Sequence, residues 1–118
     1  MGNPRSVLVV DDDDDVRSFT AMVFEDFGHE VFIAENGAAA LDLLDHNPAV
    51  SIMFSDVRMP GMSGQELAAE ALRRYPALKI ILTSGFHGEQ PLADIPFISK
   101  PWRPTELKRL LDGILNAH

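Results

Sequence analysis

Cysteine is absent from the 118 residues of this chain, and so are long apolar runs. Without cysteine the protein has no disulfide and no thiolate ligand for a metal, which favours the cytoplasm as its location. No apolar run approaches the ~20 residues that a membrane-spanning helix needs, and the N-terminus lacks the apolar core of a signal peptide. We therefore expect a single domain over residues 1–118, cytoplasmic and without membrane insertion.

Positive charge is also scarce in this chain. Lys and Arg number 10 against 18 Asp and Glu, which gives a formal net charge of −8. Direct nucleic-acid binding depends on clustered Lys and Arg, so this balance argues against it. Five negative charges are consecutive, at residues 11–15. The last three suit the first turn of a helix, where the helix dipole favours negative charge, whereas Asp11 and Asp12 need another explanation.

Several common site motifs are missing. The sequence has no Walker P-loop, no glycine-rich dinucleotide fingerprint and no serine in a nucleophile elbow. The spacing Asp11-x-Asp13-x-Asp15 resembles the start of an EF-hand calcium loop, but Val16 and Met22 stand where that loop needs glycine and glutamate. The histidines lack metal-ligand spacing and are expected at the surface: His29, His46, His87 and His118.

The apolar pattern alternates between short strands and amphipathic helices. Continuous apolar runs, typical of strands covered on both faces, predict strands at 7–10, 31–34, 51–55, 79–82 and 97–99. Helical spacing with start signals at Asn36, Ser63 and Pro104 predicts helices between and after them. Residues 84–96 contain two glycines and two prolines and leave room for a turn or two of helix. The prediction is an α/β fold, a five-stranded parallel sheet with helices on both faces and a short or missing fourth helix.

Polar side chains stand at the carboxyl ends of four predicted strands. In chain order they are an acid pair, a lone acid, two hydroxyls and a lysine: Asp11 and Asp12, Asp56, Thr83 and Ser84, and Lys100. In open α/β sheets this edge is where ligands bind. Each residue also has a simpler interpretation, since an aspartate after a strand is often an Asx-turn or helix cap, and Lys100 could be a solvated lysine. These simpler interpretations do not account well for polar residues at four strand ends together, so we predict a ligand-binding site.

The residue types indicate the chemistry of that site. Converging carboxylates repel one another unless a cation neutralises them, and hard oxygen ligands suit Mg²⁺. Aspartate can form an acyl phosphate, so Asp56 is a candidate nucleophile. Lys100 could pair with a phosphoryl oxygen and Thr83 could donate a hydrogen bond to another. Phe97 and Trp102 are expected to be packing residues.

At these residues the chain resembles the receiver domain of two-component response regulators. The resemblance spans almost the whole chain, in the order and spacing of that family, and the matching stretches are Val7–Asp12, Ser55–Gly64, Ile81–Gly85 and Phe97–Pro101. It implies a flavodoxin-like doubly wound sheet with strand order 2-1-3-4-5. It also implies a phosphorelay role in which a sensor histidine kinase or histidine phosphotransfer protein phosphorylates Asp56.

The resemblance assigns the remaining roles residue by residue. It implies that Mg²⁺ is bound by Asp11, Asp12, Asp56 and the backbone carbonyl of Arg58. Thr83 and Lys100 would hold the phosphoryl oxygens, and the Lys100–Pro101 peptide bond would be cis. Phosphorylation would draw Thr83 toward the new oxygens, and Phe97 would turn inward to fill the space, which changes protein contacts without a tyrosine hydroxyl.

Two alternatives remain open from the sequence. One is a small Mg²⁺-dependent phosphatase or phosphotransferase that uses Asp56, although such enzymes place a second acid two residues on, where this chain has Arg58. The other is an adaptor that works without phosphorylation. The preferred interpretation is a signalling module that is not an enzyme beyond catalysing its own phosphorylation and dephosphorylation. The partner face after Thr83 is in doubt, because Gly85 and Gly88 favour a loop where many receivers have a full helix.

Overall fold

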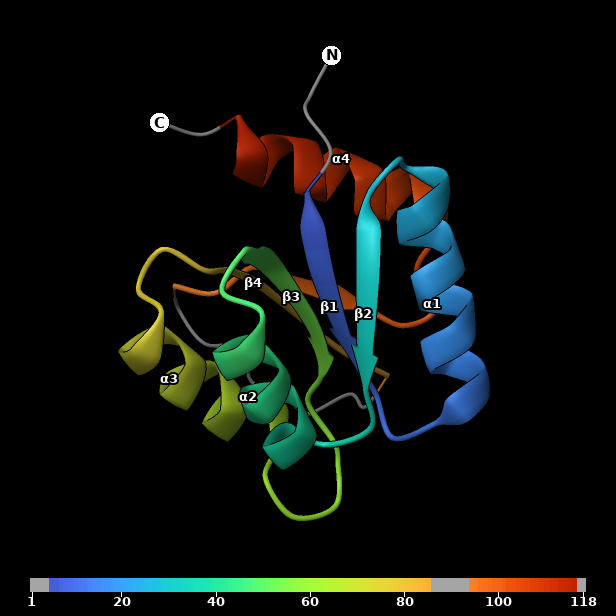
Figure 1. Ribbon diagram of the computed structural model, residues 1–118. Helices are drawn as coiled ribbons and strands as arrows, with labels where there is room; N and C mark the ends of the chain where they lie inside the picture. Colours follow the sequence, from blue (N-terminus) through green and yellow to red (C-terminus); the bar gives the residue numbers. More distant parts are fainter. Residues whose placement is uncertain (1–4, 86–93, 117–118) are drawn as a thin grey trace.

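The sheet has the predicted strand order. The computed structural model describes residues 5–85 and 94–116, in which five parallel strands pair in the order β2-β1-β3-β4-β5 (Figure 1). The strands are β1 (Ser6–Val10), β2 (Glu30–Ala34), β3 (Val50–Asp56), β4 (Lys79–Ser84) and β5 (Phe97–Ser99). The helices within the described residues are α1 (Asp14–Asp26), α2 (Gly37–His46), α3 (Gly64–Arg74) and α4 (Pro104–Leu115).

Helices cover both faces of the sheet, and this explains the continuous apolar runs of the strands. Successive residues of β3 alternate between the faces: Met53 packs with α2 and α3, and Ile52 and Phe54 pack with α1 and α4 (Figure 1). Both apolar layers contain residues that are fully inaccessible, such as Leu67 in the layer beneath α2 and α3 and Leu107 in the layer beneath α1 and α4. The strands are thereby fixed, and their carboxyl ends form one edge.

Each helix begins where the sequence predicts a start signal. The Asp13 carboxylate accepts hydrogen bonds from the first-turn amides of α1, and the Asn36 side chain accepts one at α2. Ser63 and Glu66 form a reciprocal capping box at α3, and Pro104 is the first residue of α4. The later members of the acidic run are therefore helix-start residues, as predicted.

The strands that carry the candidate site are longer than predicted. Asp56 is the last residue of β3, and Thr83 and Ser84 are the last two of β4. The prediction placed these polar residues after the strands, but the parallel ladder continues through the pairs Asp56 with Thr83 and Ser84 with Ser99. Backbone pairing to neighbouring strands therefore overrides the change from apolar to polar side chains.

Some expectations fall on or near residues that the structure does not describe. The prediction of a short or missing helix after Thr83 concerns mainly residues 86–93, including Gly88, which are outside the described residues. His87 and His118 are also outside the described residues. His46 is exposed, as expected, but His29 is half-buried, with its Nδ1 accepting a hydrogen bond from the Arg5 amide at 3.1 Å. Burial and the nearby Arg5 lower the pKa of His29.

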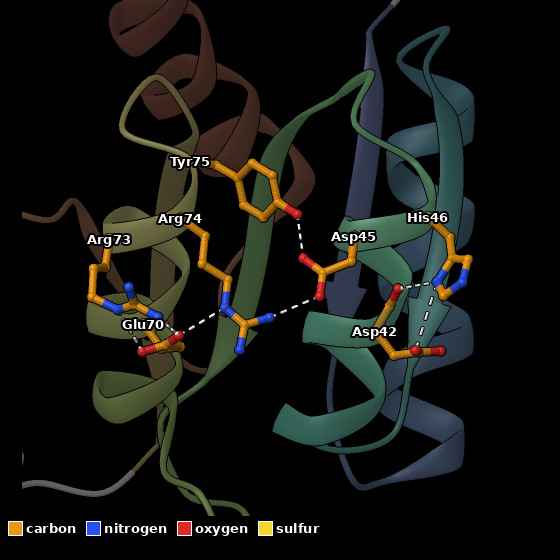
Figure 2. A network of polar contacts seen from close by, with 7 residues as sticks. All are labelled: Asp42, Asp45, His46, Glu70, Arg73, Arg74 and Tyr75. Carbon is orange, nitrogen blue, oxygen red and sulfur yellow. Dashed lines mark hydrogen bonds and ion pairs between the residues drawn. The ribbon is translucent and has the colours of Figure 1, made fainter.

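A polar network joins α2 to α3 (Figure 2). Arg74 donates hydrogen bonds to Glu70 through Nε at 2.7 Å and to Asp45 through Nη1 at 2.8 Å. The Tyr75 hydroxyl also donates to the Asp45 carboxylate, and Arg73 pairs with Glu70. Asp45 belongs to α2, whereas Glu70, Arg73 and Arg74 belong to α3 and Tyr75 is its C-cap. The network therefore holds the two helices together on one face of the sheet.

Candidate functional site

Three carboxylates converge at the carboxyl edge of the sheet. Asp11 and Asp12 follow β1 and Asp56 ends β3, and one carboxylate oxygen from each lies within 4.8 Å of the others. Asp11 is buried, and its Oδ1 accepts a hydrogen bond from the Asp13 amide at 2.9 Å. Asp56 is buried as well, whereas Asp12 is exposed. The sequence prediction that these three residues come together is confirmed in its geometry.

Lys100 brings a positive charge to the same point. Its Nζ lies 3.4 Å from Asp11 Oδ2 and 3.4 Å from Asp56 Oδ2. The Lys100 amide donates to the Ser84 carbonyl at 3.1 Å, and the Lys100–Pro101 peptide bond is cis, as predicted. One ammonium group shared between two carboxylates offsets only part of their mutual repulsion, so the cluster retains excess negative charge.

The electrostatics of Asp56 reflect its position. Burial raises the pKa of the Asp56 carboxyl above its usual range, and the neighbouring Asp11 carboxylate adds to the rise. The Lys100 ammonium and the Arg58 amide lower it, but the net shift is upward. A carboxylate destabilised in this way gains from any added cation that approaches it.

Thr83 contributes a buried hydroxyl with no partner. Among the described residues, its Oγ1 is inaccessible and makes no hydrogen bond, although Thr83 pairs with Asp56 in the register of β3 and β4. Leaving a buried hydroxyl unsatisfied costs roughly 1–3 kcal/mol, so such a group needs an explanation. A donor at this edge, beside the acid cluster, suits the recognition of an incoming oxygen ligand.

The donor set fits a hard divalent cation. Carboxylate oxygens from Asp11, Asp12 and Asp56 are the ligand type that Mg²⁺ prefers, and the exposure of Asp12 leaves room for water. Excess negative charge remains after Lys100 is counted. The Arg58 amide donates to Asp56 Oδ1 at 3.4 Å, which keeps Arg58 beside the cluster; its carbonyl as a ligand stays a prediction.

Among the hollows lined by described residues, two include residues that adjoin the acid cluster. One of about 430 Å³ lies along the segment after Asp56 and is lined by Arg58, Pro60 and Gln65 among others. The other, of about 580 Å³, separates α1 from the segment after β5 and is lined by Phe19, Lys100 and Trp102 among others.

The Trp102 ring packs against Phe19 and Phe54 at centroid distances of 5.8 and 5.6 Å, which confirms its packing role.

Phe97 lies one step away from the site. It pairs with Leu82, the residue before Thr83, and is partly buried against the apolar layer beneath α2 and α3. Its packing role is confirmed, whereas a switching role for Phe97 stays a prediction.

Two residues that contact the backbone of Asp56 were not identified from the sequence. The Ser55 hydroxyl donates to the Asp56 carbonyl oxygen at 3.0 Å, and the first residue of α3, Gly64, lies against the same carbonyl. In the sequence, Gly64 was part of a capping signal and the last residue of the family-like stretch Ser55–Gly64, and neither observation assigned it a contact with Asp56. A single sequence gives no signal for a close approach between backbones.

Comparisons with known proteins establish the family of this chain. A family model described as the response regulator receiver domain matches residues 7–112. The chain belongs to this family and is a phosphoacceptor receiver module of two-component signalling.

Individual relatives match over nearly their whole length. The chain is 34% identical over 119 residues to the response regulator receiver protein CpdR of Brucella abortus (strain 2308), covering 96% of this chain and 98% of CpdR. It is 32% identical over 120 residues to a chemotaxis protein CheY homolog of Campylobacter jejuni (strain 81-176), covering 94% and 92%. The crystal structure of the receiver domain from the hybrid histidine kinase CckA matches with a TM-score of 0.82 at 28% identity, covering 94% and 99%. Within the described residues, no helix is long and apolar enough to cross a membrane.

Proposed function

We propose that Asp56 accepts a phosphoryl group from a phosphohistidine on a sensor histidine kinase or histidine phosphotransfer protein. The observation that carries this proposal is the convergence of three carboxylates within 4.8 Å, with Lys100 Nζ 3.4 Å from two of them. Asp56 is the buried carboxylate whose strand pairs with that of Thr83, so it has both the cation and the hydroxyl donor at hand.

Different residues of this chain have different roles in the phosphoryl transfer. The bond from phosphorus to an Asp56 carboxylate oxygen forms as the bond to the donor imidazole nitrogen breaks, and that nitrogen keeps the electron pair. Lys100 neutralises charge on the phosphoryl oxygens, and the Thr83 hydroxyl donates a hydrogen bond to one of them. Asp11, Asp12, Asp56 and the Arg58 carbonyl would hold Mg²⁺, which when bound orients the phosphoryl oxygens and offsets their charge.

Phosphorylation then changes the contacts of the domain. A phosphoryl group supplies acceptor oxygens for the Thr83 hydroxyl, which has no partner among the described residues, and movement of Thr83 toward them would leave space for Phe97 to turn inward. A difference in partner affinity between the two forms requires that they differ at a contact surface. We expect Phe97→Ala to reduce the ratio of partner affinities between phosphorylated and unphosphorylated protein; an unchanged ratio would remove Phe97 from the switch.

The cellular setting follows from the same chemistry. The donor is a histidine kinase or phosphotransfer protein, in keeping with the likeness to a part of the sensor kinase CckA of Brucella abortus, which is 31% identical over 122 residues, 98% of this chain and 13% of CckA. The net charge of −8 disfavours direct nucleic-acid binding. We propose a cytoplasmic module that transmits the signal through protein contacts and catalyses only its own phosphorylation and dephosphorylation.

Phosphoryl stoichiometry distinguishes this function from that of a phosphatase. The purified protein is incubated with Mg²⁺ and either acetyl phosphate or a phosphomonoester, and phosphate release and bound phosphoryl are counted per chain. A receiver takes up at most one phosphoryl group from acetyl phosphate and leaves the phosphomonoester intact. Repeated turnover of the phosphomonoester would instead support an aspartate-nucleophile phosphatase, and neither reaction on folded protein would support a phosphorylation-independent adaptor.

A further inference from the structure

Gly64 makes an unusually close contact with the phosphoacceptor. As the first residue of α3 it is buried, and its amide donates to the Val57 carbonyl at 2.8 Å. A Cβ added at Gly64 would lie 2.3 Å from the Asp56 carbonyl oxygen and 2.8 Å from Val57 Cα. Both of these neighbours are backbone atoms, so no flexible side chain can move aside to make room.

The residues Asp56–Arg58, here called the acceptor turn, are bonded at successive backbone groups. The Asp56 carbonyl accepts from the Ser55 hydroxyl at 3.0 Å, and the Val57 amide donates to the Thr83 carbonyl at 2.9 Å. The Val57 carbonyl accepts from Gly64, and the Arg58 amide donates to Asp56 Oδ1 at 3.4 Å. The direction of the Asp56 carboxylate therefore depends on where this backbone lies.

We infer that Gly64 and Ser55 are positioning residues, which set the acceptor turn so that the Asp56 carboxylate and the Arg58 carbonyl face the same cation. The inference rests on the proposed function. Ser55 fixes the Asp56 carbonyl through its hydroxyl, and Gly64 lets α3 pack directly on that carbonyl. Both residues contact the Asp56 carbonyl and neither belongs to the acid cluster, so both act through Asp56.

The packing of α3 determines whether the helix or the acceptor turn moves when a larger residue replaces Gly64. Leu67, Ala68 and Ala71 of α3 are fully buried against the sheet, so retreat of the helix would open the core. The segment after Asp56 buries Val57 and Met59 but exposes Arg58, Pro60 and Gly61, so it can shift at a lower cost than the helix. A methyl group at Gly64 therefore displaces the acceptor turn, and cation binding weakens. Loss of such supporting contacts in metal sites typically lowers metal affinity or activity by about 10–100-fold.

The test compares Gly64→Ala and Ser55→Ala with two controls. Gly113→Ala makes the same change inside α4, where an added Cβ meets nothing within 4 Å. Val23→Ala removes buried apolar volume beneath α1, away from the acceptor turn, and lowers stability without altering the site. For each variant, urea unfolding is measured, Mg²⁺ affinity is obtained from amide chemical shifts titrated with Mg²⁺ alone, and the phosphorylation rate is measured with acetyl phosphate.

We expect Gly64→Ala to lower the Mg²⁺ affinity by tenfold or more and Ser55→Ala to lower it by less. Both controls should keep the wild-type affinity. Wild-type Mg²⁺ affinity and phosphorylation rate in folded Gly64→Ala would overturn the inference. If Gly64→Ala fails to fold, Ser55→Ala decides, and wild-type values there overturn it. A wild-type protein that takes up no phosphoryl group would instead refute the proposed function, which separates the two failures.

Discussion

Lys100 holds its ammonium group between two carboxylates that would otherwise repel each other. Its Nζ lies 3.4 Å from both Asp11 and Asp56, and the Lys100 side chain is 26% exposed. An exposed ion pair contributes little to stability because solvent screens it. Lys100 is partly buried and faces two acids, so we assign its main role to binding a ligand that brings further negative charge rather than to stabilising the fold.

Replacing Lys100 by an uncharged side chain of similar length tests this role. We expect Lys100→Met to slow phosphorylation of the domain by acetyl phosphate on the order of a hundredfold, as for the loss of one donor to a charged transition state. Lys108→Met is the matched control, since Lys108 pairs with Asp112 on the exposed face of α4. Stopped-time mass spectrometry gives the rates. Equal rates in wild type and Lys100→Met would contradict the assigned role.

The Thr83 hydroxyl lowers the stability of the fold but can donate a hydrogen bond to the phosphoryl group. Its buried hydroxyl has no hydrogen-bond partner among the described residues, so Thr83→Val should raise the free energy of unfolding by about 1 kcal/mol, as measured in urea. The same variant should gain less stability than wild type when Mg²⁺ and acetyl phosphate are added, because it cannot bond the phosphoryl group. Thr105→Val, at an exposed position of α4, should change neither quantity appreciably. A destabilised Thr83→Val would show that the hydroxyl is already satisfied in solution.

At the scale of single residues, the sequence predicted the acid cluster and Lys100 because each of these residues stands at the carboxyl end of an apolar run. Asp11, Asp56 and Lys100 meet at the sheet edge as expected. Ser55 and Gly64 were not predicted. Their contacts are with the Asp56 carbonyl, and a backbone contact leaves no signature in residue type.

Among the elements, α2 and α3 are joined by the polar network of Figure 2. Hydrogen bonds from Arg73 and Arg74 lower the pKa of Glu70 from 4.5 to about 2. A carboxyl whose pKa is lower in the folded than in the unfolded state stabilises the fold above its unfolded pKa, and this contribution is lost as the pH falls toward the folded value. Glu70 therefore stabilises the fold above about pH 4.5, and the contribution disappears toward about pH 2.

Urea unfolding across this range of pH tests the contribution of Glu70. We expect wild type to be more stable than Glu70→Gln at neutral pH, and the difference between them to shrink as the pH is lowered from about 4.5 to 2. Glu25→Gln, at an exposed position of α1, controls for the loss of one negative charge. A difference for Glu70→Gln that is independent of pH would show that its hydrogen bonds to arginine do not stabilise the fold.

Element types were predictable, and element ends were less so. The capping signals at Asn36, Ser63 and Pro104 each coincide with a helix start, because they act locally. The ends of β3 and β4 were predicted one or two residues too early. Strand length depends on pairing with neighbouring strands, which local composition does not encode.

On the scale of the whole molecule, the two apolar layers fix the sheet and leave its carboxyl edge for the site. Apolar runs in five strands predicted the parallel sheet, and the strand order 2-1-3-4-5 followed from the family resemblance. Helix packing on both faces explains why the strands carry few polar residues before their ends. The site is thus a consequence of topology: residues from β1, β3, β4 and the end of β5 converge because their strands are parallel neighbours.

The central claim is that Asp56 is the phosphoryl acceptor, and chemical reduction of the acyl phosphate tests it most directly. The protein is treated with acetyl phosphate, with and without Mg²⁺, then with borohydride, which converts an aspartyl phosphate into homoserine that peptide mass spectrometry can locate. We predict homoserine at position 56 only when Mg²⁺ is present, and none in Asp56→Asn. Homoserine at another aspartate, or none at all in folded wild-type protein, would contradict the assignment.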